Sequence, residues 1–374
     1  MDAYSCSSLR RKRDWNWLIT PKASVVRALP ALDHLVALSD DTGIIQHAVY
    51  DVPNRSTGYC TDDVSRAFMV ALARLQLEPL HEPAARLASI YLAFLCDAQM
   101  HDGRFHNFMS FARMWLDDVG TQDSFGRAMW SVGYGMRYAP RESWKSVCAA
   151  MLSRGLPAIS QLQYLRSQAY SIIGLTLAAQ SGLSDRLQCE RAVRQLAESL
   201  KNAYLENGDV GWQWFEGTMT YDNARLPQAL LQAGLLLSDQ ELIAIGMRTL
   251  AFYESVVIEN GVFVPIGNDG WYVRGGRRAR FGQQPLEAVA LIDAALAAYE
   301  ATSDRAFLDL CEVGLNWFYG RNTSGAVMVS AGGCKDGIDQ NAVNRNMGAE
   351  STVSYLAAAF ALSAKPRKSL KIVR

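Results

Sequence analysis

TDDVSRA at residues 61–67 opens a long apolar segment, and QDSFGRA at residues 122–128 and YDNARL at residues 221–226 open two more. Each stretch carries an acid that is followed three or four residues later by an arginine. An acid favours the first turn of a helix because its carboxylate meets unpaired backbone N–H groups and the positive end of the dipole. An arginine at that spacing lies on the same helix face. The repeated pattern therefore predicts several helices that begin at one common, acidic surface.

Helical periodicity extends over most of the chain and predicts twelve helices. Their expected ranges are 22–39, 62–78, 84–97, 123–138, 142–154, 167–181, 186–205, 222–237, 239–257, 283–300, 304–319 and 349–363. Segments such as 283–300 are apolar on most sides, whereas 186–205 has the polar stripe of a solvent-facing helix. Alternating inner and outer helices predict six hairpins in a ring. The expected fold is all-α, an (α/α)6 barrel (a toroid of six helical hairpins) with short β segments in its rim loops.

The composition is that of an ordinary globular protein, with 49% hydrophobic and 20% charged residues and a formal net charge of zero. No linker-like run divides the chain. We expect an N-terminal extension over residues 1–20, one catalytic barrel domain over residues 21–364 and a basic tail over residues 365–374. The balanced charge argues against a nucleic-acid partner, and no apolar run is long enough for a membrane span.

Seven widely spaced cysteines include no C-x-x-C pair, which argues against a zinc ribbon or a redox pair. They are typical of buried thiols in a reducing compartment, so we expect a cytoplasmic protein. No H-E-x-x-H or similar metal spacing occurs. We expect neither a metal nor an organic cofactor, and the oligomeric state is left open.

The six-hairpin pattern resembles the (α/α)6-barrel glycosidase-like class over nearly the whole chain, from about residue 20 to 364. That class includes glycoside hydrolases, unsaturated-glycuronyl hydrolases and sugar epimerases. More narrowly, five motifs resemble bacterial proteins labelled glycosyltransferase-like or glycosidase-related. These motifs are YCTDD (59–63), DGRF (102–105), YDNARLP (221–227), QQPLEA (283–288) and GAEST (348–352). The resemblance implies the fold and a sugar ligand, but it supplies no reaction and no catalytic residues.

Glycoside hydrolysis needs two carboxyl groups across the scissile bond, about 5 Å apart for retention or roughly 6.5–9.5 Å apart for inversion. Asp63 and Asp222 are the leading candidates, because an arginine three residues on favours the ionised form that a nucleophile or base needs. Glu216 follows the apolar run WQWF, and such surroundings favour the raised pKa of a general acid. Asp123 and Glu350 are further catalytic candidates at predicted helix starts.

A structural role is the alternative for each of these acids, either as a helix cap or in an Asp–Arg pair. Asp62 is expected to cap the helix that begins there. The loop arginines near residue 280 form a cluster that favours a phosphate or carboxylate ligand, so a sugar phosphate is a second substrate class. Aromatic side chains of the entry loops favour stacking on sugar rings. The predicted substrate-binding residues are Tyr59, Arg66, Arg127, Trp212, Trp214, Tyr221, Arg225, Trp271, Arg280 and Gln284.

Together these patterns predict a glycoside hydrolase that acts on an oligosaccharide. A sugar epimerase or isomerase is an open alternative, and it would need a histidine pair drawn from His47, His101 and His106. A glycoside phosphorylase and a non-catalytic sugar-binding or glycosyltransferase-partner module are also open. Two carboxylates within about 10 Å across an open cavity favour the hydrolase over the epimerase.

Overall fold

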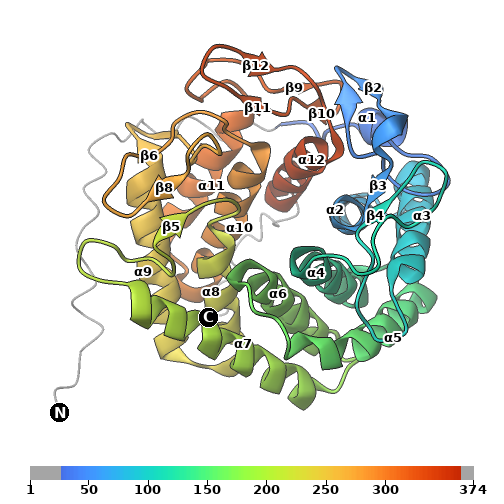
Figure 1. Cartoon of the computed structure of the whole chain (residues 1–374), viewed down its shortest axis with the longest axis horizontal. Helices are drawn as coiled ribbons and strands as arrows, with labels where there is room; N and C mark the ends of the chain where they lie inside the picture. The colour runs from blue at the N-terminus through green and yellow to red at the C-terminus, as the bar shows by residue number, and fades with distance from the viewer. Residues whose placement is uncertain (1–26, 364–374) are drawn as a thin grey trace, which may run out of the picture.

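Six inner helices form a closed ring in the computed structural model, which describes residues 27–363 (Figure 1). They are α2 (Thr61–Leu77), α4 (Gln122–Tyr138), α6 (Leu165–Ser181), α8 (Arg225–Leu237), α10 (Pro285–Thr302) and α12 (Ala349–Ser363). Each inner helix packs against the next, and α12 returns to pack against α2. The predicted all-α (α/α)6 barrel is therefore confirmed, and every inner helix lies within a few residues of its expected range.

The outer layer contains α3 (Glu82–Ala98), α5 (Glu142–Ile159), α7 (Arg186–Asn207), α9 (Gln240–Val257) and α11 (Ala306–Phe318). At the sixth outer position, the described residues form only the five-residue helix α1 (Asp33–Ala37). The long helix predicted over 22–39 is therefore wrong within the described residues. Pro30 lacks the N–H that a helix interior requires, and the helical turn begins only after it.

The inner helices are buried on most sides and the outer helices on one, as predicted. Along α7, for example, Val193, Leu196 and Leu200 are buried at a helical spacing while the opposite face is exposed. The closest inner pair is α4 and α6, whose backbones touch through Gly133 and Gly174. A Cβ on Gly133 would lie 2.0 Å from the carbonyl oxygen of Gly174, so only glycine allows this approach.

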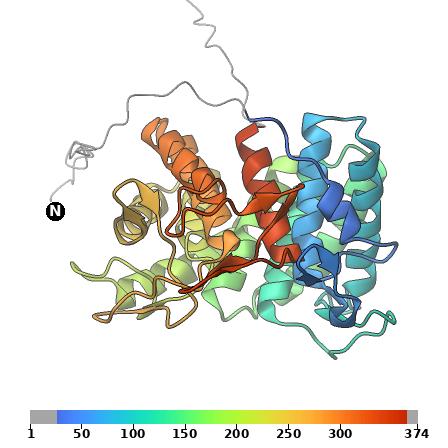
Figure 2. The same ribbon diagram turned by 90° about the horizontal axis from the view of Figure 1, so that it is seen from above.

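Short antiparallel strand pairs occupy the loops, and Figure 2 shows the longer loops gathered at one end of the ring. The pairs in the described chain are β1 (Ala48–Val49) with β2 (Val52–Pro53), β3 (Tyr59–Cys60) with β4 (Phe108–Met109), β5 (Thr218–Met219) with β8 (Tyr272–Val273), β6 (Ile258–Glu259) with β7 (Val262–Phe263), β9 (Val329–Ser330) with β10 (Gly333–Cys334), and β11 (Gly337–Ile338) with β12 (Val343–Asn344). Strands β3 and β5 lead toward α2 and α8, so this end carries the starts of the inner helices. We call it the rim.

The helix starts differ from the repeat that the sequence suggested. Thr121 caps α4, because its hydroxyl accepts from the N–H of Ser124 at 3.1 Å. Asp62 does not cap α2, whose N-cap residue is Cys60 and makes no side-chain capping bond. Asp222 precedes α8 and has φ +49°, so that helix begins three residues later than expected. The three similar stretches therefore place their acids in different backbone settings.

The predicted extension over residues 1–20 and the predicted tail over 365–374 lie outside the described residues. Between residues 27 and 363, no helix is both long and apolar enough to cross a membrane.

Candidate functional site

A chain of ion pairs crosses the lumen of the barrel near the rim. On the α12 side, Glu350 lies 3.1 Å from Arg66, which also contacts Asp63 at 2.8 Å and Asp62 at 3.4 Å. Asp62 in turn lies 2.8 Å from Arg127 of α4. One guanidinium thus holds carboxylates from both α2 and α12.

The chain continues to the other side of the barrel. Arg127 lies 3.0 Å from Asp222, and Asp222 lies 3.1 Å from Arg225 of α8. The last pair joins Arg225 to Asp293 of α10 at 2.6 Å. Five carboxylates therefore share three guanidinium groups, and the cluster has an excess of acid. We call these eight residues the rim network.

Asp222 is fully buried and serves as a structural counter-ion in this network. Burial opposes its charge, but Arg225, Arg127 and the hydroxyl of Tyr170 outweigh that cost and lower the pKa of the carboxyl. Tyr170 donates to Asp222 at 2.7 Å. The expected arginine partnership is present. The side chain has no exposed surface, and its catalytic role stays a prediction.

Asp63 has the opposite electrostatic character. Burial raises its pKa to about 7, against the attraction of Arg66 and with the repulsion of Asp62 and Glu350. Asp63 is 7% exposed, so little of its surface is accessible from the rim. The arginine three residues on does not hold Asp63 ionised, which differs from the sequence-based expectation.

Three acids remain accessible from the rim. The side chain of Asp62 is 24% exposed and that of Glu350 is 36% exposed. Since both contact the guanidinium of Arg66, their carboxylate oxygens lie within about 9 Å of each other. The third acid is Asp123, which is half-buried and accepts a hydrogen bond from the hydroxyl of Tyr221. Burial raises the pKa of Asp123, and the charge of Asp62 adds to this rise.

Glu216 lies in a neighbouring cluster instead of an apolar pocket. It forms an ion pair with Arg166 at 2.9 Å, and its side chain is 34% exposed. Arg166 also donates to the carbonyl of Tyr221 and lies 4.7 Å from the centre of that ring. The run WQWF is mostly buried, whereas the Glu216 carboxyl contacts a guanidinium and solvent. The expected apolar surroundings of Glu216 are therefore absent. The role of Glu216 as a general acid stays a prediction without the environment that motivated it.

The predicted aromatic residues separate into two groups. Tyr59, Trp212 and Trp214 are 1%, 3% and 0% exposed, so their rings pack in the core and present almost no surface for the predicted stacking on sugar. Tyr221 and Trp271 are partly exposed, with ring centres 6.4 Å apart. These two rings lie beside Asp123 and Arg166 and remain candidates for a sugar contact.

The loop arginines are committed to structural pairs. Arg280 contacts Glu259 at 2.5 Å, and Arg278 contacts the same carboxylate. The two guanidinium groups of the predicted anion clamp therefore share one carboxylate within the loop, which leaves an excess of positive charge. Gln284 occupies the N-cap position of α10 without a side-chain cap bond and is partly buried.

The histidines lie apart from the rim network. The ring of His34 is bonded to the carbonyl of Met347 at 2.8 Å. His106 is bonded to the carbonyl of Asp117 at 2.9 Å and stacks on Trp115. His47 and His101 are exposed. Within the described chain, no three His, Cys, Asp or Glu side chains are arranged to hold a metal ion.

Sequence reasoning missed two members of the site. Asp293 carried a usable signal, because an acid within the apolar run LIDAA is costly to bury unless it is paired. Arg166 stands near the start of α6, where the repeat of acid and arginine is absent. No sequence spacing links it to Glu216, which lies 50 residues away in the chain.

No protein family matches this chain, and no curated protein is similar to it in sequence. Solved structures do match its fold. A sugar epimerase from a ruminal bacterium aligns with a TM-score of 0.68 at 9% identity, over 89% of this chain and 95% of the other. Cellobiose 2-epimerase from Bacillus thermoamylovorans gives 0.68 at 10% identity, over 89% and 96%. The GH76 alpha-mannanase from Bacteroides thetaiotaomicron gives 0.60 at 11% identity, over 89% and 94%. These matches confirm the fold of the six-hairpin, glycosidase-like class.

Proposed function

We propose that this chain is a carbohydrate-active enzyme that cleaves a glycosidic bond with the accessible acids of the rim. The observation that carries the proposal is the convergence of Asp62, Asp123 and Glu350 around Arg66 and Arg127, where each acid stays partly open to solvent. Glycoside hydrolysis uses two carboxyl groups that flank the scissile bond. The fold supports the proposal, since proteins of this fold include both hydrolases and epimerases of sugars.

Asp123 has the properties of the proton donor. Its pKa is raised, so it keeps a proton at a higher pH than an ordinary aspartate. The hydroxyl of Tyr221 orients its carboxyl. Asp62 has the properties of the partner carboxylate, because two guanidinium groups stabilise its negative charge. In this assignment Glu350 holds Arg66 from the opposite side and orients it.

The test is a screen of oligosaccharides for new reducing ends, with the wild type and three variants. We expect Asp123→Asn and Asp62→Asn each to lower kcat by about 10²–10⁴-fold, the usual contribution of a positioned acid or base. Asp269→Asn is the matched control, because Asp269 is an exposed acid of a rim loop outside the network. Thermal melting must show that each variant is folded at the temperature of the assay. Full turnover by both Asp123→Asn and Asp62→Asn would refute the assignment.

A sugar epimerase or isomerase is the second candidate, favoured by Asp63. A carboxyl whose pKa is about 7 exchanges protons near neutral pH, as a base that abstracts a sugar proton must. Recovery of the sugar from D2O distinguishes the two reactions. Epimerisation or isomerisation places deuterium on carbon without new reducing ends, whereas hydrolysis produces reducing ends and leaves the carbon-bound hydrogens in place. A requirement for inorganic phosphate would identify a phosphorylase, and binding without turnover a non-catalytic module.

A further inference from the structure

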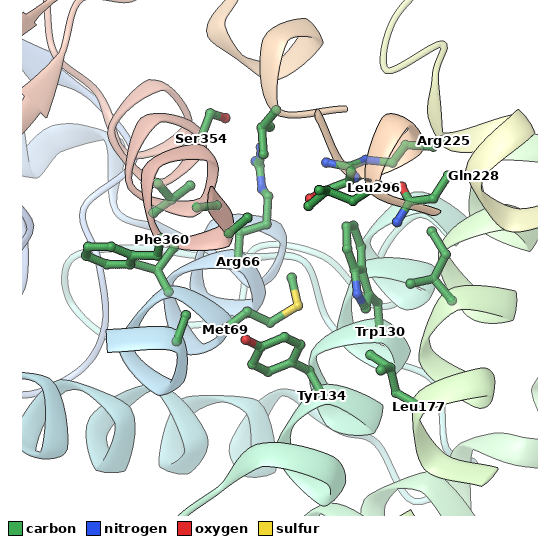
Figure 3. A pocket seen from close by; sticks show the side chains of 18 of the residues that line it. Arg66, Met69, Trp130, Tyr134, Leu177, Arg225, Gln228, Leu296, Ser354 and Phe360 are labelled. Atoms are coloured by element: carbon green, nitrogen blue, oxygen red, sulfur yellow. Dashed lines mark hydrogen bonds and ion pairs between the residues drawn. The ribbon is translucent and has the colours of Figure 1, made fainter. Parts of the chain in front are cut away.

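A cavity of about 440 Å³ fills the lumen of the barrel on the side of the network away from the rim (Figure 3). All six inner helices contribute to its wall. Its rim-side boundary is formed by Arg66 and Arg225, which are 8% and 3% exposed. At the far boundary lie Gln76, which is exposed, and Tyr138, which is partly exposed, each in the last turn of its helix. The cavity therefore opens at the end of the barrel opposite the rim.

The wall is largely apolar. Met69, Trp130, Tyr134, Leu177 and Phe360 project from four different helices around the space (Figure 3). A free sugar would present many hydroxyl groups to this wall and find few partners. The volume lies within the range of pockets that bind small molecules, which also have mostly apolar walls and a few polar groups.

Two polar atoms of the wall lack a partner within the described residues. Ser354 of α12 is 2% exposed, and its hydroxyl makes no hydrogen bond. The side-chain oxygen of Gln232 on α8 is also buried and unpaired. Both atoms have almost no accessible surface, so a ligand reaches either one only after a small rotation of its side chain. The bond that then forms recovers the free energy that a buried, unpaired polar atom costs. A serine hydroxyl donates or accepts and an amide oxygen accepts, so both fit a ligand hydroxyl.

The arginines of the wall are already paired with carboxylates, so they do not favour a charged ligand. Arg225 is paired with Asp293 at 2.6 Å and with Asp222 at 3.1 Å. Arg66 already contacts three carboxylates. We propose that the lumen cavity binds an uncharged aromatic molecule that carries a hydroxyl group. Arg66 separates this second site from Asp62 and Glu350 of the proposed active site, and the second site opens at the other end of the barrel.

The probe is 2-naphthol, titrated into the full-length protein by calorimetry, with naphthalene as the analogue that lacks the hydroxyl. Ala357 lines the cavity, so Ala357→Phe fills it and is expected to weaken 2-naphthol binding by about tenfold or more. Ala251→Phe is the matched control, since Ala251 is exposed on the outer helix α9, and it is expected to bind as the wild type does. Thermal melting of each variant shows that it is folded.

A second variant tests the polar contact without changing the cavity volume much. Ser354→Ala is expected to weaken 2-naphthol by roughly 2–10-fold and to leave naphthalene unchanged, as the loss of one hydrogen bond predicts. Asp123→Asn is expected to leave 2-naphthol binding unchanged, because Asp123 does not line the cavity. The proposal fails if the wild type does not bind 2-naphthol, if Ala357→Phe binds it normally, or if Asp123→Asn abolishes binding.

Discussion

The entrances of α2 and α8 carry the same pair of residues and use it in opposite ways. Asp63 and Arg66 lie 2.8 Å apart, and Asp222 and Arg225 lie 3.1 Å apart, each pair three residues apart in the sequence. Both acids are buried. Nevertheless, the pKa of Asp63 is raised to about 7, whereas that of Asp222 is lowered.

The difference comes from what each acid meets across the lumen. Asp222 gains a second guanidinium from Arg127 and a hydroxyl from Tyr170. Asp63 instead faces the like charges of Asp62 and Glu350, which share its arginine. Burial penalises both charges, so the neighbours decide the sign of the net shift. A local motif therefore places an acid beside an arginine, but contacts between distant segments determine whether the acid is ionised.

The largest expected effect on stability comes from removing the charge of Asp222. Asp222→Asn leaves Arg127 and Arg225 buried with weaker compensation, and we expect it to lower the free energy of unfolding by about 3–5 kcal/mol. Urea denaturation at pH 7 measures this loss. Asp63→Asn is the matched variant, with an expected cost of about 1 kcal/mol or less, since Asp63 is already partly protonated at that pH. Equal costs for the two variants would contradict the distinction between the pairs.

The fold could be predicted from the sequence because it depends on local patterns. The apolar periodicity around residues 123–138 and 349–363 indicates inner helices, and the structure has α4 and α12 there. The helix predicted over 22–39 failed because Pro30 interrupts a pattern that is otherwise helical. The start of α8 was misplaced because Asp222 adopts a left-handed backbone conformation, which a count of apolar spacing does not reveal.

The site could be predicted only in part, because its contacts join distant segments. Arg127 and Asp222 are 95 residues apart, and Arg66 and Glu350 are 284 residues apart. Their residue types and helix-start positions were visible in the sequence, whereas their pairing depends on how the ring closes. The burial of Trp214 was also not visible, because an aromatic residue in a loop fits both core packing and ligand contact.

A smaller effect on stability is expected from the hydroxyl of Tyr170, which bonds to Asp222 and has no counterpart beside Asp63. Tyr170→Phe removes the 2.7 Å bond to Asp222, and we expect a loss of about 1.5–3 kcal/mol, the usual range for a bond to a charged group. Tyr91→Phe is the control, because that buried hydroxyl is bonded to the neutral side chain of Ser39 at 2.6 Å. Its expected cost is about 0.5–1.5 kcal/mol. If Tyr91→Phe costs more than Tyr170→Phe in urea denaturation, the hydroxyl does not stabilise the Asp222 charge.

The last expected effect is a pH dependence that separates the two acids by sign. In the unfolded chain an aspartate has a pKa of about 3.9, so between about pH 4 and 7 Asp63 holds its proton mainly in the folded state. Stability contributed by this group therefore falls as the pH rises, by at most about 1.4 kcal/mol per pH unit, and levels off above pH 7. Asp222 acts in the other direction: its stabilisation is present above about pH 4 and is lost as the pH falls through its lower folded-state value.

Urea midpoints between pH 4.5 and 8 at constant ionic strength measure this slope. Asp63→Asn is expected to reduce the decline of the urea midpoint with rising pH. Glu287→Gln is expected to reduce it independently, because burial also raises the pKa of Glu287 to about 7. Asp269→Asn is the control and is expected to keep the wild-type slope, since its side chain is exposed. An unchanged slope in Asp63→Asn would mean that Asp63 is ionised in the folded protein throughout this range. The α2 and α8 entrances would then be electrostatically alike, and the repeat in the sequence would describe both.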